Sequence, residues 1–137
     1  MIKKIARPML AAMFVSGGYN SLVRPEMVAA KAEPVVKPLA ERLPGVPSDP
    51  ETAVRVNGAV QVVAGTMMSV GFLPRLSAAA LAATLVPTTA AGHPFWQAED
   101  PAERAQQRVH FLKNLAMFGG LLIVAFDGGE RRPASQR

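Results

Sequence analysis

Two long stretches of the chain contain no charged side chain. Residues 58–72 and residues 76–92 lack Asp, Glu, Lys and Arg. A helix on the surface of a soluble protein places polar residues on one face, at every third or fourth position. Because neither stretch offers such a face, the pattern favours helices that meet an apolar environment all around, which is typical of a lipid bilayer.

Four segments are long enough to cross a membrane as helices. A hydrocarbon core about 30 Å thick requires about 20 residues of helix. We place these helices at residues 5–22, 54–72, 75–92 and 109–126. The first and the fourth contain polar residues, so a buried helix pair in a soluble all-α protein is an alternative. The predicted fold is all-α, an integral membrane four-helix transmembrane bundle.

Pairs of an acid and a proline mark the start of two of these helices. Ser48 and Asp49 precede Pro50, and Asp100 precedes Pro101. A Ser or Asp side chain can cap a helix, and proline fits its first turn. The last helix is therefore expected to begin at Pro101 and to be about 39 Å long, at about 1.5 Å per residue, so its first turns project beyond the hydrocarbon.

The segment between the first two helices is rich in proline and cannot form one long helix. Within it, apolar and charged residues separate onto two sides, which predicts a short helix lying in the membrane interface. A solvated amphipathic loop is the alternative. The apolar side holds Val35, Val36, Leu39 and Leu43, and the other side holds Lys37, Glu41 and Arg42.

The N-terminus also has features of a secretory signal peptide. Lys3 and Lys4 precede the first apolar run, and residues 30–32 resemble a cleavage site. About twelve residues separate the run from that site, which is more than a cleavage region usually has, and this disfavours cleavage. We expect a single domain over residues 1–127, followed by a short basic tail at residues 128–137.

Polar residues inside the apolar helices are expected to face inward, because in lipid they are costly unless paired or turned toward a cavity. On the last helix, His110 and Asn114 share a face. On the second helix an amide or a small residue recurs at every fourth position, as Asn57, Gln61, Gly65 and Ser69.

Adjacent glycines mark candidate helix contacts. The missing side chains of Gly17 and Gly18 would let the first helix approach a neighbour closely, and Gly119 and Gly120 would do the same for the last helix.

The third helix and the loop after it carry an unusual combination of residues. Pro87 is expected to bend the helix, and threonines at positions 84, 88 and 89 can satisfy backbone groups that the bend opens. His93 and Trp96 follow at the helix end, where aromatic rings favour the headgroup zone. An interfacial anchor is one interpretation of this loop.

A polar pocket at one membrane face is the sharper interpretation. Hydrogen-bond donors and a titratable histidine would suit the carbonyl oxygens of a quinone headgroup, with its tail in lipid. The alternative is that these side chains only hold the helices together. The candidate residues are Asn57, Gln61, His93, Trp96, His110 and Asn114.

Composition narrows the chemistry. The chain has 137 residues, 50% of them hydrophobic, and no cysteine, so it cannot build a thiol relay or a thiolate-held cluster alone. His93 and His110 stand in different segments without a metal-binding helix motif, so we predict no metal site. The net charge of +5 comes with no nucleic-acid-binding motif, and anionic lipid explains it better than nucleic acid.

Three segments carry a resemblance to a known family: GAVQVVAG, LPRLSAAALAATLVPTTAAGHPFW and QQRVHFLKNLAMFGGLL. Together they resemble the DoxX family of small four-helix bacterial membrane proteins. The resemblance implies a bundle in the bacterial plasma membrane and, for some relatives, a subunit role in quinone-linked or oxidative-stress oxidoreductase assemblies. It supplies no active site, and the chain itself has no catalytic motif.

Three functions follow as hypotheses. The first is a membrane subunit associated with an oxidoreductase, the second a non-catalytic scaffold or assembly factor, and the third a small-solute permease. Expected partners are the lipid bilayer and other membrane or peripheral proteins, and a homo-oligomer is an open alternative. The loop after the first predicted helix and the loop after the third lie opposite the termini and together hold eight of the ten acids, which favours both termini in the cytoplasm.

Overall fold

The computed structural model describes residues 1–127, and all regular secondary structure within them is helical. This confirms the predicted all-α class. The predicted tail at residues 128–137 lies outside the described residues. The elements are α1 (Ile2–Val23), α2 (Glu26–Arg42), α3 (Pro50–Val70), α4 (Pro74–Gly92), the short 3₁₀ helix η1 (Phe95–Gln97) and α5 (Pro101–Phe126).

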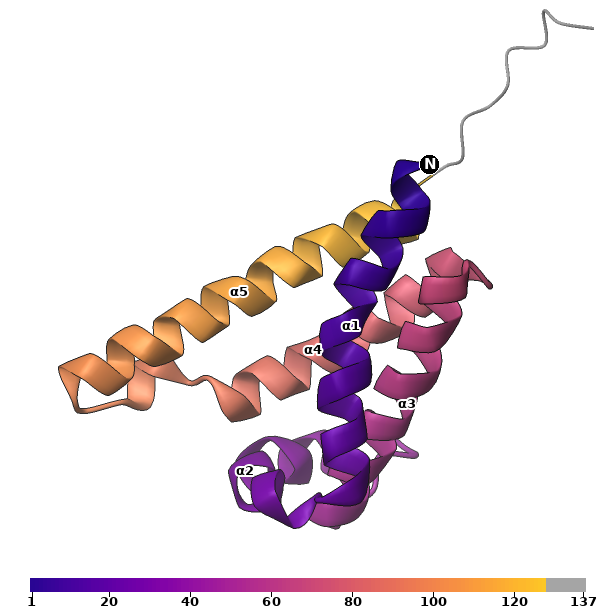
Figure 1. Cartoon of the computed structure of the whole chain (residues 1–137). Coiled ribbons are helices and arrows are strands. Elements are labelled where there is room, and N and C mark those ends of the chain that lie inside the picture. Colours follow the sequence, from indigo (N-terminus) through magenta and orange to yellow (C-terminus); the bar gives the residue numbers. More distant parts are fainter. Residues whose placement is uncertain (128–137) are drawn as a thin grey trace, which may run out of the picture.

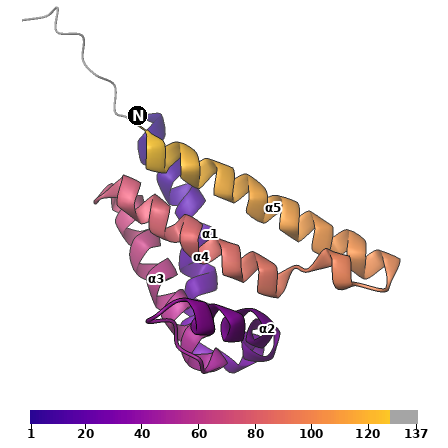
Figure 2. The ribbon, with the colours of Figure 1, turned by 180° about the vertical axis from the view of Figure 1, so that it is seen from behind.

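The helices form two hairpins that diverge from a common end. Helices α1 and α3 run antiparallel, and α2 lies across their far end (Figure 1). Helices α4 and α5 form the second hairpin, which Figure 2 shows leaning away from the first. The start of α1 and the end of α5 lie together, where Lys3 Nζ is 2.7 Å from Asp127 Oδ2. In the same region Arg75 Nε donates a hydrogen bond to the Ala125 carbonyl oxygen.

The main helices have lengths that match a bilayer, but they differ from one another in hydropathy. At about 1.5 Å per residue, α1, α3 and α4 are roughly 33, 32 and 28 Å long, close to the hydrocarbon thickness of about 30 Å. Of the described helices, only α5 is both long and apolar enough by composition to cross a membrane, with a mean hydropathy of 1.7 over its most apolar window. Only 11% of that window is buried, unlike the core helix of a soluble protein.

The buried core is small and is shared by the two hairpins. Phe14 of α1 and Met68 of α3 pack with Leu81 of α4 and Leu121 of α5. Many large apolar side chains point outward instead, and Ile123 on α5 is 75% exposed. Large exposed apolar surfaces are rare on soluble monomers and are typical of contact with lipid or with another protein.

Glycines allow α1 and α3 to touch along their backbones. A Cβ atom added at Gly18 would lie 2.7 Å from the Gly58 carbonyl oxygen, and one added at Gly58 would lie 2.6 Å from the Gly18 oxygen. The predicted close approach at Gly18 is therefore confirmed. The predictions for Gly17 and Gly119 were wrong, because an added Cβ atom meets nothing within 4 Å at either.

The predicted caps are confirmed. The Asp49 carboxylate accepts a hydrogen bond from the backbone N–H of Thr52 at 2.8 Å, and Pro50 stands in the first turn of α3. Bonds from the Thr52 hydroxyl and backbone N–H lower the pKa of Asp49. Asp100 caps α5 in the same way, with Pro101 as the first helical residue.

Helix α2 is longer than the sequence predicted. We expected a short helix near Val35, but α2 covers 17 residues and continues through Pro34 and Pro38. Each proline removes one N–H from the helix ladder and leaves the carbonyl four residues earlier unpaired. Ala30 and Pro34, which carry those carbonyls, are exposed, so the unpaired oxygens belong to residues at the surface of the protein. Apolar Val36 faces Val54 of α3.

Candidate functional site

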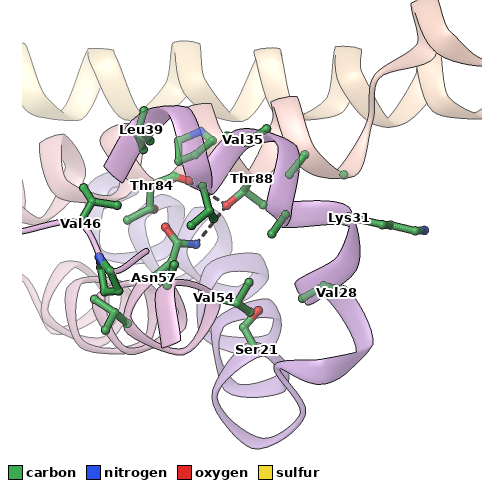
Figure 3. A pocket seen from close by; sticks show the side chains of 18 of the residues that line it. Ser21, Val28, Lys31, Val35, Leu39, Val46, Val54, Asn57, Thr84 and Thr88 are labelled. Atoms are coloured by element: carbon green, nitrogen blue, oxygen red, sulfur yellow. Dashed lines mark hydrogen bonds between the residues drawn. The ribbon is translucent and has the colours of Figure 1, made fainter. Parts of the chain in front are cut away.

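A cavity of about 500 Å³ lies between α2, α3 and α4. Figure 3 shows it from close by, with side chains of α2, including Val35 and Leu39, on one side and Asn57 of α3 on the other. Its walls are mainly apolar, and valine and alanine are the most frequent lining residues. The polar and charged lining residues are Ser21, Lys31, Asn57, Thr84, Thr88 and His93.

Thr88 is the polar centre of the contact between α3 and α4. Its Oγ1 accepts hydrogen bonds from Asn57 Nδ2 at 3.1 Å and from Gln61 Nε2 at 3.4 Å. The Thr88 hydroxyl in turn donates to the carbonyl oxygen of Thr84 at 2.8 Å. Gln61 is only 5% exposed, so this network satisfies an amide that would otherwise be buried without a partner.

Thr89, the next residue along the chain, forms a hydrogen bond with α5, the other helix that packs against α4. Thr89 Oγ1 accepts a hydrogen bond of 2.9 Å from Nδ2 of the buried Asn114 on α5. Successive helical residues point about 100° apart, so adjacent threonines can face different helices. A second, smaller hollow of about 310 Å³ lies on this side of α4, and Trp96, Phe111 and Asn114 are among its lining residues.

The two histidines meet at the loop end of the α4–α5 hairpin. Their rings stack with centroids 5.0 Å apart and planes at 21°. His93 Nδ1 lies 2.8 Å from Gln107 Oε1, in the first turns of α5. Burial lowers the pKa of His93, and the nearby positive charges of His110, Lys113 and Lys31 act in the same direction, while the bond to Gln107 opposes them.

Aromatic side chains hold the short helix η1 against α5. Phe95 and Phe111 meet edge to face with centroids 5.2 Å apart, and Trp96 meets Phe111 in the same manner at 6.2 Å. Trp96 is more than half exposed, consistent with a residue that also faces the surroundings of the protein. Packing of this kind fixes where the loop places His93 relative to His110.

The structure distributes the six candidate residues over two hollows. Asn57 and His93 line the cavity between α2, α3 and α4, whereas Trp96 and Asn114 line the hollow between α4 and α5. Gln61 reaches the first group through Thr88, and His110 stacks on His93.

Sequence reasoning missed two features of the site. It treated the threonines of α4 as partners for the backbone, but Thr88 and Thr89 also accept bonds from amides of neighbouring helices. It also did not assign a wall to the first loop, where Val35 and Leu39 of α2 close the cavity. The available signal for these bonds was that amides occur on α3 and threonines on α4, both within apolar helices.

The cavity is suited to hold a small amphipathic molecule. Its volume lies in the usual range for ligand pockets, and it combines apolar walls with few polar atoms. Within residues 1–127, no three His, Cys, Asp or Glu side chains are grouped so that they could hold a metal ion. The arrangement therefore supports binding and orientation of a ligand by hydrogen bonds and apolar contact.

Comparison with known proteins identifies the family. A search of curated proteins finds no match, and neither does a search of solved structures. The sequence model of the DoxX family matches residues 2–94, from α1 to the loop after α4. The matched region includes the cavity and ends just after His93, before η1 and α5. Because the match covers more than half of the chain, this protein belongs to the DoxX family of membrane proteins.

Proposed function

We propose that this protein spans the bacterial plasma membrane four times and serves as a cysteine-free membrane subunit of an oxidoreductase or oxidative-stress complex. In this role the cavity between α2, α3 and α4 holds an apolar molecule with a polar headgroup, of the quinone class. The cavity, with Asn57, Thr88 and His93 in otherwise apolar walls, is the observation that carries the proposal.

Helix geometry supports the four-span topology. Helices α1, α3, α4 and α5 are each long enough to cross the hydrocarbon, and their outer faces carry large apolar side chains. The start of α1 and the end of α5 are joined by the Lys3–Asp127 ion pair, as expected if both lie on one side. The distribution of acids in the loops favours the cytoplasm for that side.

The position of the cavity fits a ligand that enters from the lipid. Helix α2 covers the beginning of α3 and the end of α4, so the cavity lies near one end of the helices rather than at their middle. If α2 lies in the interface, a ligand headgroup at Asn57 is close to the water boundary. An attached apolar tail then extends along the valines toward the lipid.

Ligand binding in nanodiscs tests this proposal. We expect a short-chain quinone, offered in its oxidised and its reduced form, to bind the full chain in at least one form. The variants Asn57→Leu and His93→Ala should weaken binding, because each removes a polar atom from the cavity wall. Thr89→Val is the matched control, since Thr89 faces α5. If neither the oxidised nor the reduced quinone binds to the full chain, the proposal is contradicted.

A non-catalytic scaffold or assembly factor is the second candidate. It is favoured by α5, because only 11% of its most apolar window is buried and its exposed apolar side chains can contact another membrane protein. Purification of the tagged chain from native membranes distinguishes the two. Stoichiometric partners without bound ligand would favour the scaffold, and recovery of this chain with itself alone would indicate a homo-oligomer.

A further inference from the structure

The threonine hydroxyls in the cavity wall already donate their hydrogen bonds to backbone carbonyl oxygens. Thr84 donates to the carbonyl oxygen of Leu81 at 2.8 Å, and Thr88 donates to that of Thr84 at 2.8 Å. Both acceptors belong to the backbone of α4 itself. A hydroxyl has one proton and two lone pairs, so each threonine offers only its lone pairs to other groups.

The bond pattern at Thr88 also fixes the orientation of Asn57. Because the Thr88 proton is committed, Thr88 Oγ1 can only accept, and the nitrogen of the Asn57 amide turns toward it. The Asn57 oxygen consequently points away from Thr88, as Figure 3 shows. Within residues 1–127 no group donates a hydrogen bond to that oxygen. The α3 wall therefore presents an unused acceptor to the cavity.

His93, which also lines the cavity, has a free acceptor for a similar reason. Its Nδ1 faces Gln107 Oε1, which is an amide oxygen and accepts only, so Nδ1 carries the proton. In the neutral ring Nε2 then keeps its lone pair. The lowered pKa of His93 favours this neutral form.

The remaining donors lie at the edges of the cavity. Lys31 is exposed, and in Figure 3 its side chain extends away from the other lining residues. Ser21 belongs to the end of α1 and lies apart from Thr84 in the same view. Among the other polar lining side chains within residues 1–127, the remaining free donor is the second amide proton of Asn57. Acceptors therefore dominate the region bounded by Asn57, Thr84 and His93.

We infer that this cavity selects an apolar molecule that carries a hydrogen-bond donor, such as a phenol or a hydroquinone, over the same molecule with acceptors alone. The inference rests on the proposed function, because it names the headgroup chemistry of the same site. It reverses the expectation from the sequence that donors would face quinone carbonyl oxygens. The hydroxyl-bearing, reduced form of a quinone thus binds more tightly than its oxidised form.

A matched pair of probes tests the inference without any redox reaction. 2-Naphthol and 2-methoxynaphthalene have the same ring system, and only the naphthol has a hydroxyl proton. Equilibrium dialysis against the full chain in nanodiscs, corrected with empty nanodiscs for partition into lipid, gives both dissociation constants. We expect naphthol to bind roughly two- to tenfold more tightly, which corresponds to one net hydrogen bond.

Three variants locate the acceptor. Asn57→Leu, Thr84→Val and His93→Phe each remove one acceptor from the wall, and the variant that removes the bonding atom should abolish the preference for naphthol. Thr89→Val, on the other side of α4, should preserve it. A preference that persists in every folded variant of the wall would overturn the assignment to this cavity.

The outcomes separate the inference from the proposed function. Equal binding of the two probes, or tighter binding of the methoxy compound, overturns the inference and leaves ligand binding intact. Binding of neither probe overturns both. The comparison of the two probes on the unmodified chain gives a result even if a variant fails to fold.

Discussion

The two helical hairpins of this protein are held together by different means. Helices α1 and α3 touch along their backbones at Gly18 and Gly58, where no side chain intervenes. Helices α4 and α5 instead meet through an amide–threonine bond at Asn114 and aromatic packing near the loop. The first contact depends on shape alone, whereas the second depends on polar and aromatic partners at particular positions.

This difference indicates which hairpin can change. Lipid tails are as apolar as leucine, so close packing and interhelical hydrogen bonds, rather than apolar burial, drive helix association in membranes. The α1–α3 contact has no space to adjust. The α4–α5 hairpin leaves most of α5 unburied, so it is the part that has room for lipid, a partner or another copy of the chain.

The largest effect is expected from filling the glycine contact. Gly58→Ala places a Cβ atom 2.6 Å from the Gly18 carbonyl oxygen, so the two helices must move apart. Overpacking of this kind destabilises by about 1–3 kcal/mol, and occasionally more. Thermal unfolding in detergent measures the change. Gly17→Ala is the control, because its added Cβ atom meets nothing within 4 Å, and equal losses in both variants would contradict the backbone contact.

The glycines also show what the sequence could and could not predict. Capping by Asp49 and Asp100 is local, so the sequence predicted it correctly. The inward position of Gln61 followed from its spacing in an apolar helix. The role of Gly58 depends on which helix lies opposite and in what register, and one sequence does not contain that information.

The candidate site was predictable to a similar extent. The amides were recognised as inward because an unpaired amide in lipid is costly. Their partners were not, because Thr88 and Thr89 face different helices only once α4 lies between α3 and α5. Helix α2 was predicted too short, because the prolines of this segment were taken to exclude a long helix, although Pro34 and Pro38 both lie on its exposed side.

A smaller effect is expected at the α4–α5 contact. Replacing Asn114 with Leu removes the bond to Thr89 and should cost about 1 kcal/mol, the usual size of an interhelical hydrogen bond. A double-mutant cycle with Thr89→Val, measured by unfolding in detergent, isolates the coupling free energy between Asn114 and Thr89. Full additivity of the two changes would show that the bond does not couple the helices.

A pH dependence should arise at the loop end of the same hairpin. Because the folded-state pKa of His93 is lowered, the unfolded chain takes up the proton first. Stability is therefore complete above about pH 6.5 and declines as the pH falls below it, by less than about 1 kcal/mol since solvent screens the ring. Melting temperatures of the wild type and His93→Gln between neutral and acidic pH test this. An equal decline in both would exclude His93 as its source.

The smallest effect is expected where the ends of the two hairpins meet. Lys3→Gln removes the ion pair with Asp127, whose side chains are both partly exposed. Exposed ion pairs contribute roughly 0–1 kcal/mol, and salt screens them. The variant should therefore unfold almost as the wild type does, also at low ionic strength. A loss as large as that of Gly58→Ala would mean that this end holds the hairpins together.

Cysteine labelling from each side of the membrane tests the four-span topology most directly, because the chain has no cysteine of its own. Single cysteines at Lys4 and Phe72 mark one end of the helices, and those at Ser48 and Glu99 mark the other, all at exposed positions. An impermeant maleimide should label the first pair from one side and the second pair only from the opposite side. Labelling of all four from the same side would contradict the topology.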